Sequence, residues 1–335
     1  MTHDTTTLRD ASAERLNAHV EHLAHTLGDR KPGSDAERQA AAYVREQLRA
    51  AGIDDVREQP FRTPSTASAS VIPYIGAALV ANLLGRAGRI GRILGGAGMI
   101  AAAWGLRRAL GGAPIPYLPL VATADSVNVI ARIPPRSQVK RFVIVMAHLD
   151  SGAPSFGLVG RHTPGANDNA SGIAALIELG GMLHAEPLDH IEVVLLFTGA
   201  HGANSVGINA YLDQYAPPKD FTTFINVLAV GARGAPLAYL HASGVFAFSM
   251  TRPSPQITAL VNRAANQHPE YGVYGRRAAR LDDTSAVRAR GYAGITLAGV
   301  SRAGQVTDAP LNAIDPEQIA RAVGFVRRVL AALDG

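Results

Sequence analysis

The sequence predicts an α/β fold, a three-layer domain in which helices flank a mixed, largely parallel β-sheet. Three observations predict it. From Asp125 onward, short apolar runs typical of strands alternate with segments of helical periodicity. Hydrophobic residues make up 47% of the chain and charged residues 18%, which suits a sizeable core. A chain of 335 residues is long enough for one large domain of this class or two small ones.

The N-terminal part is predicted to be helical before the first strand. Apolar residues recur at helical spacing over residues 16–27. Ser34 and, three residues later, Glu37 have the spacing of a capping box at the start of a second helix, over 36–51. Residues 55–61 are predicted to form an edge strand.

The remainder is predicted to alternate between strands and helices. The expected strands cover residues 127–133, 142–147, 191–197, 221–230, 237–241 and 294–297. The expected helices cover residues 172–184, 208–214, 255–266, 284–290 and 316–333. We therefore predict one α/β domain, made of residues 1–70 and 111–335.

Residues 71–110 differ from the rest and are predicted to form an inserted hairpin. Two apolar runs flank a basic stretch, residues 86–92, and each run is too short as a helix to cross a hydrocarbon core of about 30 Å. The second run is amphipathic, with arginines on one face. We interpret the segment as a shallow hairpin on an anionic bilayer. The alternative is a pair of Gly/Ala-rich helices packed on the protein or at a dimer interface.

The basic charge of the chain belongs mainly to the same region. The net charge is +5, yet no acidic residue lies between Glu58 and Asp125, while six arginines do. Without them the chain is nearly neutral, and no basic patch interleaved with aromatic residues is present, so we expect no nucleic-acid partner. The N-terminus does not resemble a secretory signal, so we expect a cytoplasmic protein or one at the inner face of the plasma membrane. The chain has no cysteine, which excludes thiolate ligands and a cysteine nucleophile.

A candidate metal site follows the strand predicted at 142–147. His148 stands at the strand end with Asp150 next but one, and the loop PGANDNASG, which contains Asp168, opens the next helix. Ligands collect at strand carboxyl ends in such sheets, and a histidine with a carboxylate suits a divalent ion. Asp150 could accept the second ring N–H of His148 and so orient it.

These segments resemble peptidase family M28, whose members are zinc aminopeptidases. HLDS followed by PGANDNASGIAALIEL is similar to the family's ligand segments, and LGDRKPGSDAERQAAAYVREQLRAAGIDDV is similar to its lead-in. The resemblance covers most of the chain except 71–124. It implies a zinc-dependent exopeptidase-like fold with two zinc ions above the strand ends.

The resemblance also implies a role for individual positions. His148 matches a histidine ligand, Asp168 the bridging aspartate, and Asp150 the carboxylate that supports a ligand. The general-base position holds His201, and a further family aspartate matches Asp283. The other three ligand positions hold residues that do not match the family's metal ligands, namely Gly202, Leu228 and Gln305.

We therefore expect a degenerate site with at most one zinc ion. Catalytic zinc normally keeps three protein ligands and a water, and the glutamate base is absent as well. The leading interpretation is a pseudo-aminopeptidase that binds a peptide or small molecule or acts as a scaffold. One alternative is a remodelled single-metal hydrolase with His148, Asp168 and His201 as ligands, or with His162 contributing. Another is a membrane-attached assembly subunit in which 71–110 is the functional part.

Overall fold

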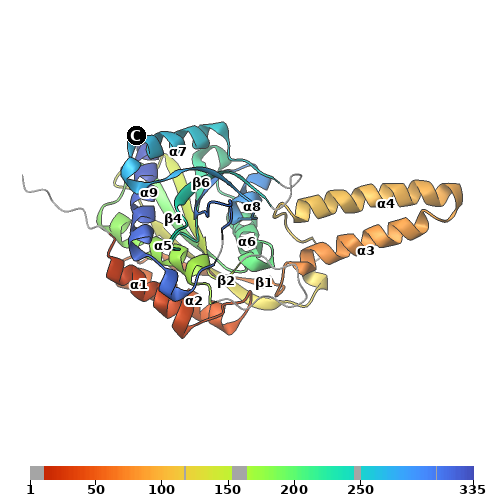
Figure 1. Cartoon of the computed structure of the whole chain (residues 1–335), viewed down its shortest axis with the longest axis horizontal. Helices are drawn as coiled ribbons and strands as arrows, with labels where there is room; N and C mark the ends of the chain where they lie inside the picture. Colours follow the sequence, from red (N-terminus) through yellow and green to blue (C-terminus); the bar gives the residue numbers. More distant parts are fainter. Residues whose placement is uncertain (1–10, 117, 153–163, 245–249, 307) are drawn as a thin grey trace, which may run out of the picture.

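The fold is built on one eight-stranded sheet. The computed structural model describes residues 11–116, 118–152, 164–244, 250–306 and 308–335 (Figure 1). The strand order is β1-β2-β4-β3-β5-β8-β6-β7, and the four central strands run parallel to one another. The strands are β1 (Val56–Thr63), β2 (Ala124–Ile133), β3 (Arg141–His148), β4 (Ile191–Thr198), β5 (Thr222–Leu228), β6 (Leu237–Ser243), β7 (Tyr274–Ala278) and β8 (Ala293–Gly299). The pairs β1/β2, β2/β4 and β6/β8 are antiparallel, so the sheet is mixed.

Helices cover both faces of the sheet, because successive side chains of the central strands point to opposite faces and both sets are apolar. Along β3, Val143 and Val145 belong to one apolar core, whereas Ile144 and Met146 belong to another. The first core is closed by α1 (Ala13–Glu21), α2 (Asp35–Ala50), α5 (Gly172–Ala185), α7 (Pro255–Gln267) and α9 (Pro316–Asp334). The second is closed by α6 (Val206–Tyr215) and α8 (Asp283–Ala289) (Figure 1). The predicted three-layer α/β class is confirmed.

The predicted elements agree with the structure except at one edge of the sheet. The helix expected over 16–27 is α1 continued by a helical turn, His22–Thr26. Ser34 caps α2 by accepting a bond from the Glu37 backbone N–H at 3.2 Å, and the Glu37 carboxylate accepts from the Gly33 N–H at 2.8 Å. Strand β7, at the opposite edge from β1, was not predicted. The remaining short helical turns are Leu118–Leu120, Ala166–Ser171, His201–Ala203, Lys219–Phe221, Pro269–Tyr271 and Leu311–Ala313.

The inserted segment forms two antiparallel helices that project from the domain, α3 (Ser68–Leu84) and α4 (Gly88–Ala109) (Figure 1). They pack on one another through small residues. A Cβ atom at Gly95 would lie 2.5 Å from the Ala81 carbonyl oxygen and 2.7 Å from the Gly85 backbone nitrogen. The outer surfaces of both helices remain exposed, so the alternative of a pair packed on the domain is not what the structure shows. Within the described residues, neither these nor any other helix is long and apolar enough to cross a membrane.

Candidate active site

The candidate site lies beyond the carboxyl ends of β3 and β4. His148 is the last residue of β3, His201 begins the helical turn after β4, and Asp168 lies in the turn Ala166–Ser171 that leads into α5. All three side chains are buried. The two imidazole rings stack with centroids 4.2 Å apart. The structure thus brings together three residues that the sequence placed in one site.

Asp168 is paired with Arg280, a residue that the sequence did not indicate. The guanidinium donates to both carboxylate oxygens, from Nη1 to Oδ2 at 2.6 Å and from Nη2 to Oδ1 at 3.0 Å. His148 Nε2 lies 3.1 Å from the same Oδ1. The Arg280 side chain is 6% exposed and that of Asp168 is 2% exposed, so this bidentate pair is shielded from water.

The hydrogen bonds of His148 require the imidazolium form. Its Nδ1 donates to the Asp150 carbonyl oxygen at 2.8 Å, and its Nε2 faces the Asp168 carboxylate, so both ring nitrogens meet acceptors. Burial lowers the pKa of His148, but Asp150 and Asp168 outweigh burial and raise that pKa to about 9. Burial in turn raises the pKa of Asp168, whereas Arg280 and His148 together hold it well below its usual range.

Asp150 does not orient His148 in the way that was expected. Its carboxylate Oδ1 is 3.6 Å from His148 Nδ1, beyond a hydrogen bond, and the backbone carbonyl holds the ring instead. The carboxylate accepts from the backbone N–H groups of His201 at 2.9 Å and Gly202 at 2.6 Å. Asp150 therefore fixes the turn after β4. Its two carboxylate oxygens bond to the two backbone N–H groups, which are nearer than the imidazole of His148.

The Nδ1 atom of His201 is held by the carboxylate of Asp283. Its Nδ1 lies 2.7 Å from Asp283 Oδ1, and the Thr198 hydroxyl donates to Oδ2 of the same carboxylate at 2.6 Å. Burial raises the pKa of Asp283, but the charge and the hydrogen bond of His201 outweigh burial, so the pKa lies well below its usual range. Among the described residues, no hydrogen-bond partner faces His201 Nε2, which is buried.

Three further groups, the buried Arg30 and Glu37 and the half-buried Asp308, position these loops, and sequence reasoning missed the role of each. Arg30 is fully buried and donates to backbone carbonyls of both site loops, at Leu149 (2.9 Å) and Pro164 (3.0 Å). Asp308 accepts from the backbone N–H groups of Gly165, Asn167 and Asp168 at 3.0–3.1 Å. Glu37 accepts from the Ala200 N–H at 2.7 Å. The capping-box spacing was the only sequence signal for any of them.

The turn after β4 is held in a strained conformation. Ala200, Asn204 and Ser205 have φ values of 55°, 74° and 58°, in the left-handed region that favours glycine. Such conformations persist only where the surroundings over-determine them. Here the buried side chains of Glu37 and Asp150 accept hydrogen bonds from the backbone N–H groups of residues 200–202, and these bonds hold the turn in its conformation.

The family model for peptidase family M28 matches residues 128–322, which is more than half of the chain. The chain belongs to peptidase family M28. No curated protein sequence matches it significantly.

Solved structures of zinc aminopeptidases share the fold. The zinc aminopeptidase of Bacillus subtilis superposes with a TM-score of 0.65 at 15% identity, covering 96% of this chain and 95% of that one. An aminopeptidase from Aneurinibacillus sp. strain AM-1 gives 0.64 at 17% identity, with 96% and 94% covered. A glutaminyl cyclase from Porphyromonas gingivalis gives 0.60 at 18% identity, with 95% and 97% covered. Because aminopeptidases and a glutaminyl cyclase share it, the fold alone does not fix the reaction.

The three remaining M28 ligand positions hold residues whose surroundings differ from one another. Leu228 is fully buried in an apolar cluster with Ala298 and Val300. Gln305 is exposed, and its backbone bonds to Ser301. A Cβ atom at Gly202 would lie 3.0 Å from Asp150 Oδ2, so a larger residue there would press on the carboxylate that holds the turn.

The described residues do not fit the M28 metal pair. No three histidine, aspartate or glutamate side chains among them are grouped so that they could hold a metal ion. The Asp168 oxygens that would bridge two ions are taken by Arg280 and His148. His162, which the sequence offered as a further ligand, lies outside the described residues.

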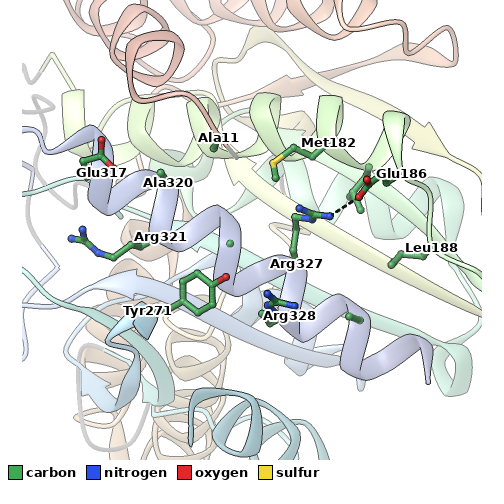
Figure 2. A pocket seen from close by; sticks show the side chains of 13 residues that line it. Ala11, Met182, Glu186, Leu188, Tyr271, Glu317, Ala320, Arg321, Arg327 and Arg328 are labelled. Atoms are coloured by element: carbon green, nitrogen blue, oxygen red, sulfur yellow. Dashed lines mark hydrogen bonds and ion pairs between the residues drawn. The ribbon is translucent and has the colours of Figure 1, made fainter. Parts of the chain in front are cut away.

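A cavity of about 340 Å³ lies away from this site, against α5 and α9 (Figure 2). Its wall includes Tyr271 and the ion pair of Arg327 with Glu186, whose atoms are 3.1 Å apart. None of the residues around Asp168 lines it. The cavity is therefore separate from the candidate site around Asp168.

Proposed function

We propose that this M28 protein is catalytically silent and that it keeps the peptidase fold as a scaffold or as a module that binds a peptide or small molecule. The observation that carries the proposal is the bidentate contact of Arg280 with Asp168. A planar guanidinium matches a carboxylate at two points and stays charged at any physiological pH. It therefore supplies the positive charge that the buried carboxylate needs without a metal ion.

The residues available for hydrolysis support the same reading. Metal-assisted hydrolysis needs an ion with an open coordination position and a base that deprotonates the bound water. His148 and Asp168 are the two expected ligands present, and both are engaged with each other. His201 stands at the position of the base, and its Nδ1 is committed to Asp283.

An aminopeptidase assay tests the proposal. Purified protein is incubated with aminoacyl-p-nitroanilides in the presence of zinc, cobalt or manganese, and the Asp168→Asn variant serves as the matched control. We expect the wild-type protein and the variant to release p-nitroaniline at the same background rate. Release that a chelator abolishes, and that Asp168→Asn also abolishes, would contradict the proposal.

A second candidate function is a single-metal hydrolase that uses His148, Asp168 and His201. Two observations favour it: the stacked imidazoles, 4.2 Å apart, and the buried His201 Nε2 that meets no partner among the described residues. Arg280 would have to leave Asp168 before an ion could bind. If this candidate is correct, His201→Ala removes both bound metal and activity; if both are unchanged, it is wrong.

A further inference from the structure

We propose that the hairpin of α3 and α4 docks in plane on an anionic lipid bilayer, with its apolar side chains in one leaflet and its arginines against lipid phosphates. This inference goes beyond the proposed function and does not depend on it. It concerns a part of the chain that the family match, residues 128–322, does not include.

The hairpin exposes large apolar side chains along its whole length. On α4, Ile90, Ile93 and Ile100 are each 73–74% exposed, and Trp104 is 59% exposed. On α3 the exposed side chains are Ile72, Ile75, Leu79, Val80, Leu83 and Leu84. A run of this size rimmed by charges marks a surface that is covered by a partner or by a membrane.

The charges of the hairpin select an anionic partner. Three exposed arginines, the tip arginines, surround the turn between the helices: Arg86, Arg89 and Arg92. Arg107 and Arg108 lie at the other end, and no acidic residue occurs between residues 59 and 124. No carboxylate of the described residues forms an ion pair with any of these five. An anionic leaflet attracts such a segment, and each arginine near its surface strengthens binding by about fivefold.

A second feature lies at the base of the hairpin. A cavity of about 310 Å³ is lined by Trp104, Arg107, Arg108 and Met250, among others. The Arg108 guanidinium lies 4.9 Å from the centre of the Trp104 ring. Arginine beside tryptophan, on an apolar helix, is the chemistry that holds a lipid phosphate at the level of the headgroups. The cavity therefore offers a place for one phospholipid headgroup.

The length of α3 and the composition of α4 favour an orientation in the plane of the membrane. α3 has only 17 residues; α4 has 22, but glycines and arginines interrupt its apolar run, so neither helix is long and apolar enough to cross a membrane. Arginines stand at both ends of the hairpin, and both groups reach the same layer of headgroups only if the hairpin lies along it. Self-association through the hairpin is less favourable, because the paired copies would bring arginines together with no carboxylate on either hairpin to compensate.

Vesicle flotation with the full chain tests the charge requirement. The vesicles are phosphatidylcholine alone or phosphatidylcholine with about a third phosphatidylglycerol. We expect binding to the anionic vesicles only, weakened at least about 100-fold when the three tip arginines are changed to glutamate. The matched control makes the same change in net charge at exposed arginines elsewhere, Arg49→Glu, Arg263→Glu and Arg328→Glu, and should float like the wild-type protein.

A second pair of variants tests the apolar contact. Ile93→Gln with Ile100→Gln should abolish flotation, whereas Val139→Gln with Phe221→Gln, at exposed sites outside the hairpin, should not. Unchanged melting temperatures show that each variant is folded. Failure of the wild-type protein to float, or equal loss in both matched controls, overturns the proposal. So does sedimentation that shows a stable dimer lost in the Ile93/Ile100 variant.

Discussion

Arg280 is the residue that distinguishes this site from a metal centre. It reaches Asp168 from the segment between β7 and α8, and both side chains are buried. A buried carboxylate cannot lose a charged partner without a large penalty, because desolvation is then uncompensated. The stability of the domain should therefore depend on this pair.

Replacing Arg280 by methionine should lower the free energy of unfolding by about 3 kcal/mol, since the buried Asp168 carboxylate then loses its bidentate partner and keeps the imidazolium of His148 as its remaining charged contact. Urea denaturation at neutral pH measures the change. Arg277→Met, three residues away and exposed, should alter it by less than about 0.5 kcal/mol. The double variant Arg280→Met with Asp168→Asn should be more stable than the sum of the single losses predicts. An Arg280→Met protein as stable as the Arg277→Met control would show that the pair is not formed.

The protonation of His148 makes a prediction about pH. Its folded-state pKa, about 9, lies above the value of 6.5 for an unfolded chain. The stabilisation is therefore fully present below about pH 6.5 and is lost as the pH rises towards 9. The difference in unfolding free energy between the wild-type protein and His148→Gln should thus shrink by a few kcal/mol from pH 6 to 9. A constant difference would contradict it.

At the scale of the elements, the hairpin depends on glycines in α4. A Cβ atom at Gly95 would meet the backbone of α3 at 2.5 Å, whereas one at Gly96 would meet nothing within 4 Å. The two helices therefore approach one another closely at Gly95, whereas Gly96 faces solvent. The same substitution at the two positions separates helix packing from helix propensity.

Gly95→Leu should loosen the hairpin, and Gly96→Leu should not. Overpacking of this kind costs about 1–3 kcal/mol, so amide exchange in α3 and α4 should accelerate about ten- to a hundredfold in the first variant. The urea midpoint of the domain should stay unchanged in both, because the hairpin projects from it (Figure 1). Equal exchange in the two variants would show that the helices do not pack through Gly95.

At the scale of the whole molecule, most of the fold could be predicted from the sequence. The central strands are continuous apolar runs, and the amphipathic helices between them have clear periodicity, so the position of each element along the chain and its type were predicted, but the order of the strands in the sheet was not. β7 was missed because its residues, YGRRA, include a glycine and two arginines and lack an apolar alternation. An edge strand needs little apolar character, since one of its sides lacks a neighbour.

The site could be predicted only in part, for a related reason. His148, Asp168 and His201 follow strands that are easy to recognise, and the structure brings them together. Arg280 follows the strand that was missed and is 112 residues from Asp168 in the chain, so no local pattern connects them. The contact is set by tertiary packing and becomes visible only in the structure.

Zinc content tests the central claim most directly. The protein is dialysed against buffer with micromolar free zinc, desalted, and measured by elemental analysis beside Asp168→Asn. If Arg280 takes the place of the metal, wild-type protein and variant will both retain far less than one zinc ion per chain. Retention of one or two zinc ions by the wild-type chain, lost in Asp168→Asn, would contradict the account.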